Sequence, residues 1–383
     1  MMTNGQETAY SYIMDWYKNR SSLVYRLGGP AGSGKSWLIR LIAEAVGRDK
    51  CLLMTPTGKA SNNLIKSGLE SHTIHSQIYR VKRNSEEPED GGAADSVESL
   101  MQYLTRDDTE YDTESAGFIL KEPGSFDQFS LFIIDEGSMV GEKLLGDILS
   151  FGIPTLLVGD PNQLPPVEDK SVFTKCDYYL DEIVRQAQGS PIIWLSQQIL
   201  QGNIATGSFG TSQVRKAGPT DEELRFADQV LTDTNISRTD LNSRMRPLYL
   251  EGRALLSLFS QGDKIICRTN TNLFSSEGFA LTNGAQGTIK TIKHIVRKGQ
   301  IIDLVMSTAD LGEFRFVGTN VPQKFPAAVR PPKIEYGYAL TVHLSQGSEW
   351  DNVIFRATRR ISKSSLYTAV TRAKQSVLVT LET

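Results

Sequence analysis

The sequence predicts an α/β fold, with two domains in tandem that are each built on a mainly parallel sheet. Apolar runs in the first half end abruptly in polar residues, helix-period segments separate these runs, and the second half repeats the style without repeating the sequence. A chain of 383 residues with 39% hydrophobic content is long enough for two globular domains. We place the boundary between residues 176 and 177.

The segment Gly29–Ser36, GPAGSGKS, follows an apolar run at Leu23–Leu27. A helix-period pattern comes after it and ends at Gly47, with apolar positions at Leu38, Leu41, Ile42, Ala45 and Val46. Between a strand and a helix, such a loop surrounds a nucleotide's β-phosphate with main-chain amides, and its lysine and hydroxyl reach phosphate oxygens and Mg²⁺. We therefore predict a nucleotide site at Gly29, Pro30, Ala31, Gly32, Ser33, Gly34, Lys35 and Ser36. The alternative is a glycine-rich turn without a ligand.

Three further apolar runs end in chemically useful residues. Cys51–Met54 leads into TPTGK, Leu131–Ile134 into Asp135-Glu136, and Leu156–Val158 into GDPNQ. The carboxyl ends of parallel strands share one sheet edge, where ligands bind in open α/β sheets. There Asp135 is placed to hold Mg²⁺, and Glu136 to orient and deprotonate the attacking water. A solvated loop is the alternative for the paired carboxylates.

An insertion at about 77–127 interrupts the first domain. Its flanks, 78–81 and 117–120, have the composition of short strands and predict a hairpin or small subdomain with a long acidic tip. The window 84–116 contains eleven acidic residues and one basic residue, which gives it a charge of −10. The chain as a whole carries −3, so the remainder is +7, and the negative total does not exclude nucleic-acid binding.

The second half predicts another α/β sheet. Its expected strands are 226–231, 353–355 and 376–380, and its expected helices are 192–200 and 364–373. Short strands with turn signals at 264–267, 287–292 and 301–306 predict a small β-barrel-like insertion, at about 288–335.

The cysteines and the apolar runs restrict the class of protein. Cys51, Cys176 and Cys267 lie far apart with no paired spacing, which favours small core residues over disulfides or a zinc site. No apolar run approaches the length of a membrane span, and the N-terminal segment has no secretory pattern. We expect a cytoplasmic protein with no membrane partner, in the host cytoplasm if a phage encodes it.

The motifs occur in one fixed order along nearly the whole chain. They read GPAGSGKS, TPTGKAS, TIHS, IIDEGSM, VGDPNQLPP, LDEIVRQ, GYALTVHLSQGSE and LYTAVTRAK. This ordered set resembles the motifs of superfamily-1 helicases of the RecD/Dda type.

The resemblance implies two RecA-like lobes with ATP and Mg²⁺ bound between them, a hairpin-like insertion in the first lobe and an SH3-like β-barrel in the second. On the matching residues it implies that Gln6 reads adenine and Gln163 senses the γ-phosphate. Arg185 and Arg372 would be arginine fingers from the second lobe, and Glu349 would also contact the nucleotide. An arginine supplied to the γ-phosphate is worth ~10³–10⁵ in rate.

The resemblance also implies contacts with the backbone of single-stranded DNA. The residues at the matching positions are Thr57, Lys59, Thr73, His75, Asn235, Arg238, Thr341, His343 and Ser345. As alternatives, the two histidines are buried structural residues, and Asn235 with Arg238 caps a turn. Phe118 is the candidate strand-separating wedge, with an ordinary packed residue as the alternative, because the long acidic insertion departs from a compact hairpin.

The expected activity is an ATP-dependent helicase or translocase, active as a monomer on single strands and single/double-strand junctions, with 5′ to 3′ polarity taken from the resemblance alone. Replication or recombination proteins are the partners to expect. A phosphate-loop ATPase that remodels protein or phosphorylates a small molecule is a second hypothesis, but it leaves GYALTVHLSQGSE and LYTAVTRAK without a role. A binding module with a decayed motor is a third, although every catalytic residue type is present.

Overall fold

The computed structural model describes residues 2–81, 118–166, 169–182, 189–250, 259–269, 271, 273–279, 281–296, 300–308, 312–319, 332–358 and 361–381. The predicted arginine finger Arg185 and the acidic window 84–116 lie outside them. The chain divides into two compact units. The first unit comprises Met1–Ile78, Leu120–Arg238 and Leu340–Thr383, and the second comprises Tyr79–Ile119 and Thr239–Ala339.

The first sheet of the first unit is parallel and has six strands in the order β3-β2-β6-β7-β1-β8. The strands are β1 (Val24–Gly28), β2 (Cys51–Thr55), β3 (His72–Thr73), β6 (Leu131–Ile134), β7 (Thr155–Gly159) and β8 (Tyr178–Tyr179). All four predicted runs form strands here. Because β6, β7 and β1 are neighbours, the residues that follow them meet at one edge, as predicted.

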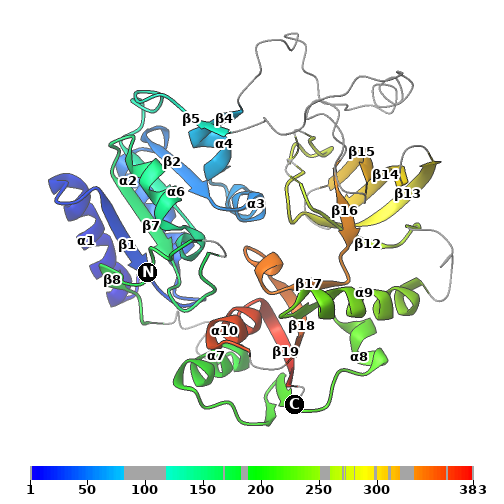
Figure 1. Ribbon diagram of the computed structural model, residues 1–383. Coiled ribbons are helices and arrows are strands. Elements are labelled where there is room, and N and C mark those ends of the chain that lie inside the picture. The colour runs from blue at the N-terminus through cyan, green and yellow to red at the C-terminus, as the bar shows by residue number, and fades with distance from the viewer. Residues whose placement is uncertain are drawn as a thin grey trace. The chain divides into compact units, whose positions relative to one another are not determined.

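The helices of this part of the chain are α1 (Asn4–Asn19), α2 (Lys35–Val46), α3 (Gly58–Lys66), α4 (Ile74–Ile78) and α6 (Glu142–Leu149), with 3₁₀ turns at Arg48–Lys50 and Gly137–Met139. Figure 1 shows α1 and α2, in blue, beside β1. The buried face of α2 is Leu38, Ile39, Ile42 and Ala43. The prediction was wrong for Ala45, which is exposed. The buried face of α2, which shares a core cluster with Leu27 and Leu156, therefore includes Ile39 and Ala43, and the expected face had Leu41 and Ala45 in their place.

The second sheet of the same unit has the order β17-β11-β18-β19-β10-β9, in which β11, β18, β19 and β10 run parallel and β9 antiparallel. Its strands are β9 (Gly207–Phe209), β10 (Ser212–Arg215), β11 (Gln229–Thr232), β17 (Ala339–Thr341), β18 (Trp350–Ala357) and β19 (Ala373–Leu381). The remaining helical elements are α7 (Pro191–Gln201), α8 (Asp221–Phe226), α9 (Asn235–Leu250), α10 (Lys363–Val370) and the 3₁₀ turn η5 (His343–Ser345). The predicted strands at 353–355 and 376–380 and helices at 192–200 and 364–373 are confirmed, although α10 ends three residues before the predicted end.

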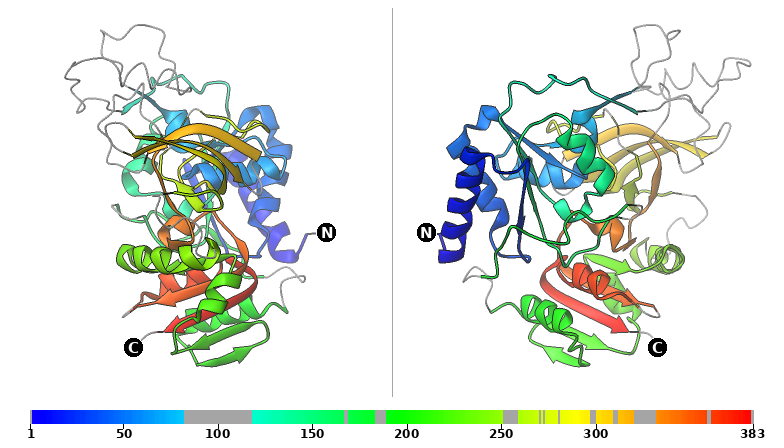
Figure 2. Two further views of the ribbon diagram at one scale, coloured as in Figure 1. Left: turned by 90° about the vertical axis from the view of Figure 1, so that its right-hand side faces the viewer. Right: turned by 60° about the vertical axis from the view of Figure 1, so that its left-hand side comes forward.

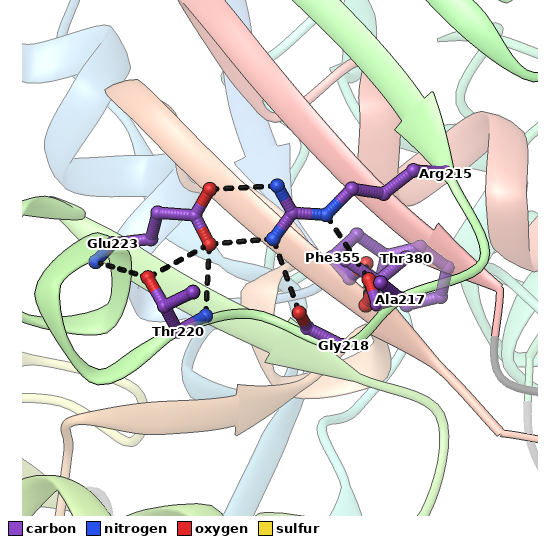
Figure 3. Close-up of polar contacts among 7 residues, drawn as sticks. All are labelled: Arg215, Ala217, Gly218, Thr220, Glu223, Phe355 and Thr380. Atoms are coloured by element: carbon purple, nitrogen blue, oxygen red, sulfur yellow. Dashed lines mark hydrogen bonds and ion pairs between the residues drawn. The ribbon is translucent and has the colours of Figure 1, made fainter.

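The strand predicted at 226–231 starts later than expected. Thr220 caps α8, Glu223 completes the capping box, and the helix continues to Phe226 before β11 begins at Gln229. Arg215, at the end of β10, places its guanidinium on both carboxylate oxygens of Glu223 at 2.8 and 2.5 Å (Figure 3). The capping box and the ion pair together hold the start of α8 against β10.

The second unit contains an antiparallel five-stranded sheet, β15-β14-β13-β12-β16. Its strands are β12 (Lys264–Cys267), β13 (Gln286–Val296), β14 (Gln300–Thr308), β15 (Gly312–Thr319) and β16 (Ile334–Tyr336). The three short strands predicted here are confirmed, and Figure 2 shows that the long strands curve strongly. Ile265, Leu281, Met306 and Phe314 belong to a buried cluster on this sheet. Closure into a barrel stays a prediction.

The insertion of the first domain begins and ends in a two-stranded sheet of β4 (Tyr79–Val81) and β5 (Phe118–Leu120), which confirms the predicted strand-forming flanks. Phe118 is the first residue of β5. All three cysteines are free. Cys51 and Cys267 are buried as expected, whereas the prediction was wrong for Cys176, which is only partly buried. Among the described residues, no helix combines the length and the apolar character that crossing a bilayer requires.

Candidate nucleotide and nucleic-acid site

The loop between β1 and α2 has the backbone conformation of a phosphate cradle. Gly32 and Gly34 adopt φ of 79° and 83°, a region that favours glycine, and Gly34 directly precedes the first residue of α2. A Cβ on Gly29 would lie 2.7 Å from Ser33 Oγ, so only glycine fits there without displacement. Lys35 Nζ donates hydrogen bonds to the main-chain oxygens of Gly29 and Pro30 at 2.7 and 2.8 Å. The lysine ammonium thus lies at the mouth of this loop.

Charges from several elements converge on Lys35. Burial lowers the pKa of Lys35, the carboxylates of Asp160, Asp135 and Glu136 oppose that effect, and the Arg372 guanidinium adds to it. Lys35 and Arg372 therefore interact electrostatically inside one compact unit, although Lys35 begins α2 and Arg372 lies between α10 and β19. Arg372, from the second half of the chain, is thus among the charged groups that act on Lys35. Its role as an arginine finger stays a prediction.

Asp135 and Glu136 follow β6 directly. Burial and the neighbouring Glu136 carboxylate raise the pKa of Asp135, whereas the Glu136 backbone N–H, 2.9 Å away, and Lys35 lower it. Because a cation would relieve this cost of burying a carboxylate, the chemistry of Asp135 fits Mg²⁺. Ser36 is exposed, and its part in holding the ion stays a prediction. Glu136 adopts a left-handed conformation with φ of 57°, which is rare for a residue with a side chain and is found most often at functional sites.

The two predicted glutamines lie beside the loop. Gln6 is buried, donates from Nε2 to Ser33 O at 3.0 Å and accepts from the Thr3 backbone N–H, so it ties α1 to the phosphate loop. Gln163 is also buried, and its Oε1 has no hydrogen-bond partner. An orphaned buried oxygen is costly, which fits a group that acquires its partner when nucleotide or water binds.

Arg372 follows the end of α10 and is buried. Its Nε donates to Thr368 O at 3.2 Å, and its Nη1 donates to Ser348 O at 3.3 Å. Glu349, predicted to contact nucleotide, is exposed and lies 3.8 Å from Lys374 Nζ. The Arg372 guanidinium therefore interacts electrostatically with Lys35 while its hydrogen bonds are made within the second half of the chain.

Sequence reasoning missed several side chains that contact the candidate site. Asp160, at the end of β7, is buried and accepts a 2.6 Å hydrogen bond from the Tyr367 hydroxyl of α10. Leu164 N–H donates to Thr368 Oγ1 at 3.0 Å, and Gln346 Nε2 donates to Leu164 O at 3.2 Å. Asp160 follows an apolar strand just as Asp135 does, so the same signal was available for it; the partners of Leu164 carry no sequence signal.

The predicted DNA contacts of the first half differ in their surroundings. Thr57 caps α3 through its hydroxyl, which accepts from Ala60 N–H at 3.3 Å, and Lys59 Nζ lies 4.9 Å from the centroid of the Trp350 ring. Thr73 accepts from Ser76 N–H at 3.3 Å. His75 is exposed, although partial desolvation of its ring lowers its pKa, so it is not a buried structural histidine.

Those of the second half divide into exposed and buried residues. Asn235 is exposed at the start of α9, where the Thr234 hydroxyl accepts from Ser237 N–H, and Arg238 lies in the first turn of that helix. His343 is exposed, with a pKa that desolvation lowers. The Thr341 and Ser345 hydroxyls are buried and bonded to the backbone of Leu344 and Val342. In this structure these two residues shape the loop and do not present a hydroxyl at the surface.

Comparisons with known proteins agree with this geometry. Residues 1–216, more than half of the chain, match the family model described as AAA domain. The chain belongs to the AAA domain family. A second part of this AAA-domain chain, residues 336–380, matches the model described as UvrD-like helicase C-terminal domain. That match includes Arg372, Tyr367, Thr368 and Gln346.

Curated relatives lie in the expected subgroup. The ATP-dependent RecD2 DNA helicase of Deinococcus radiodurans is 26% identical over 92% of this AAA-domain chain and 46% of its own length. The ATP-dependent DNA helicase Dda of Enterobacteria phage T4 is 28% identical over 65% of the chain and 58% of its own length. The chain spans about half the length of these relatives. The predicted membership of the RecD/Dda type of superfamily 1 is confirmed.

Solved structures share the fold. Bacteroides Pif1 bound to single-stranded DNA has a TM-score of 0.58 at 16% identity and covers 99% of this chain and 92% of its own. Pif1 from Candida albicans has a TM-score of 0.56 at 18% identity, with 99% and 94% covered. At this identity the likeness shows the α/β architecture with its parallel sheet.

Proposed function

We propose that this chain is an ATP-dependent DNA helicase or translocase that moves 5′ to 3′ on single-stranded DNA and couples hydrolysis to duplex unwinding. The observation that carries the proposal is that Asp135, Glu136 and Arg372 all act electrostatically on the buried Lys35, although Arg372 comes from the second half of the chain. The similarity to RecD2 and Dda, which are both ATP-dependent DNA helicases, supports it.

The residues divide the chemical work between them. When bound, ATP with Mg²⁺ supplies a γ-phosphoryl group whose negative charge must be neutralised during transfer to water. Lys35 and the amides of Gly32 to Lys35 would hold the phosphates, and Ser36 and Asp135 would hold the metal ion. Glu136 would orient and deprotonate water, and Gln163 would sense the γ-phosphate.

Arg372 makes hydrolysis depend on the second half of the chain. Its guanidinium is held by two main-chain oxygens of its own half and lies in the field of Lys35. A change in γ-phosphate charge therefore alters how strongly the two halves attract each other, which is the physical basis for coupling turnover to movement. We propose the same role for Arg185 from its motif.

The nucleic-acid partner is proposed from exposed polar groups. Lys59, His75, Asn235 and His343 lie at or near the surface, and contacts of this kind with a phosphate backbone are sequence-tolerant and weaken with salt. We further propose that Phe118 acts at the strand junction, that the protein works as a monomer in the cytoplasm, and that replication or recombination proteins are its partners.

Two measurements test the proposed function. ATP turnover is compared without nucleic acid and with single-stranded DNA, RNA or duplex, and we expect the largest stimulation with single-stranded DNA. Unwinding is then compared on blunt, 5′-tailed and 3′-tailed duplexes, and we expect it on the 5′-tailed substrate. Unwinding confined to the 3′-tailed substrate overturns the polarity. A turnover rate indifferent to DNA favours the phosphate-loop ATPase that remodels protein or modifies a small molecule.

A further inference from the structure

The loop Asp160–Leu164, which follows β7 and contains Gln163, is held by two side chains of α10 and by Gln346, the residue after η5. Leu164 has both of its peptide groups engaged, because its N–H donates to Thr368 Oγ1 at 3.0 Å and its C=O accepts from Gln346 Nε2 at 3.2 Å. At the other end of the loop, the Tyr367 hydroxyl donates to Asp160 Oδ2 at 2.6 Å. These three side chains are buried, so water does not compete for the bonds.

Thr368 joins this loop to the arginine. Its side-chain oxygen accepts from Leu164 N–H, and its main-chain oxygen accepts from Arg372 Nε at 3.2 Å. A displacement of Arg372 would therefore move Thr368 and, through it, Leu164, which is the neighbour of Gln163. This connection does not require a bound nucleotide.

Tyr367 makes the corresponding link to the phosphate loop. Burial and the Asp160 carboxylate raise the pKa of Tyr367 above its ordinary range, and a hydrogen bond with the backbone of Ala31 opposes the shift. The neutral hydroxyl thus lies between Asp160 and the phosphate loop. Asp160 is in turn the carboxylate that does most to keep the Lys35 ammonium charged.

We propose that Gln346, Tyr367 and Thr368 position Gln163 and Asp160, so that a movement of α10 moves both residues. We call these three side chains, with their hydrogen bonds to Leu164 and Asp160, the latch. They are positioning residues, since each acts through another group, and the inference rests on the proposed function as an ATP hydrolase. The latch fixes the loop at Asp160 and at Leu164, on either side of Gln163, while Gln163 Oε1 has no hydrogen-bond partner. The latch therefore sets the position of an oxygen that can still accept a hydrogen bond.

Thr368→Val tests the latch because valine keeps the shape of threonine and removes the acceptor for Leu164 N–H. Thr368→Ser is the first control, because it keeps the hydroxyl. Ser364→Ala is the second control: it removes a hydroxyl of α10 whose described hydrogen bond is with Ser362, at the start of the helix. We expect Thr368→Val to lower kcat for ATP by about 10- to 100-fold with KM within about twofold. Thr368→Ser and Ser364→Ala should both keep kcat within about threefold of the parent.

A second readout needs no turnover. Hydrogen exchange of the peptide containing Leu164, measured without nucleotide, should be at least about fivefold faster in Thr368→Val and unchanged in the two control variants. Tyr367→Phe, which removes the hydroxyl that bonds Asp160 and the backbone of Ala31, provides a second variant and should show the same separation of kcat from KM.

The outcomes separate the latch from the proposed function. An absence of ATP turnover in the parent protein contradicts the proposed function, whereas the exchange experiment still decides on the latch. Equal losses of kcat in Thr368→Val and Thr368→Ser, or unchanged exchange at Leu164 in Thr368→Val, overturn the latch. A fall in kcat confined to Thr368→Val and Tyr367→Phe, together with faster exchange in Thr368→Val, supports it.

Discussion

Lys35 Nζ donates a 2.7 Å hydrogen bond to the main-chain oxygen of Gly29, at the opposite end of the loop that the lysine closes. The Gly29 carbonyl thus holds the ammonium beside the phosphate loop. The carboxylates of Asp160, Asp135 and Glu136 attract the ammonium charge. A group held in this way is already placed for phosphate oxygens, so little rearrangement is needed on binding.

Replacing Lys35 with alanine should remove the ammonium that neutralises the phosphates. We expect Lys35→Ala to lower the ATP turnover rate by at least about 10²-fold. The matched control is Lys18→Ala, an exposed lysine on α1, which should turn over ATP at the parent rate. Steady-state phosphate release measures both, and a Lys35→Ala rate near that of the parent would mean that the nucleotide binds elsewhere.

Arg372→Ala should separate nucleotide binding from hydrolysis. We expect turnover to fall by about 10³-fold, because a guanidinium at the γ-phosphate contributes mainly in the transition state. Affinity for a fluorescent ATP analogue should change by less than about fivefold. Arg372→Lys, which retains the charge but not both donors to Thr368 O and Ser348 O, should be intermediate. Parallel losses of affinity and turnover would contradict the role of Arg372 in hydrolysis.

Acid should weaken the start of α8 over a defined pH range. Hydrogen bonds from Arg215 lower the pKa of Glu223 from 4.5 to about 2. The folded state therefore binds this proton less readily than the unfolded chain, so the stabilisation is complete above about pH 4.5 and is lost as the pH falls toward 2. Glu223→Gln should lower the free energy of unfolding by about 1–2 kcal/mol at pH 7.

Urea denaturation between pH 7 and pH 3 measures this effect. The difference between parent and Glu223→Gln should shrink as the pH falls. Glu222→Gln, in the same exposed first turn of α8, should change stability by no more than about 0.5 kcal/mol. A gap between parent and Glu223→Gln that stays constant with pH would argue against the Arg215 ion pair as the cause.

Asp263 is the buried anchor of the second unit. It accepts hydrogen bonds from Arg246 Nε at 3.0 Å, from Ser260 N–H at 2.7 Å and from the Tyr338 hydroxyl at 2.7 Å. Asp263→Ala should lower the free energy of unfolding by about 3–5 kcal/mol because it leaves the Arg246 charge buried without its partner. Glu313→Gln, which breaks the exposed pair with Lys290, should cost at most about 1 kcal/mol. Similar losses in the two variants would show that burial is not the deciding factor.

Removing residues 84–116 should leave the nucleotide site intact. The window lies between the paired strands β4 and β5, and none of the site residues belongs to it. We expect the parent rate of ATP turnover and, because ten net negative charges are lost, equal or tighter binding of single-stranded DNA. A deletion variant that fails to fold would contradict the interpretation of this window as a peripheral insertion.

The sequence by itself determined the nucleotide half of the site. Each apolar run with its polar end gave a strand of the first sheet, because a strand buried on both faces needs an uninterrupted apolar pattern and its carboxyl end must reach solvent. Lys35, Asp135 and Glu136 could therefore be assigned from local pattern. Helix boundaries were less accurate: the capping of α8 by Thr220 and Glu223 moved the expected strand at 226–231 to Gln229–Thr232.

Only the tertiary structure decided which distant residues share that site. The contacts of Tyr367 with Asp160 and of Thr368 with Leu164 join positions more than 200 residues apart, and a hydroxyl on a buried helix carries no local signal of its partner. The burial of Ser345 and the exposure of His75 and His343 were likewise undetermined, because periodicity fixes which face a residue occupies but not what covers that face. Long-range packing supplies that information, and it exists only in the folded chain.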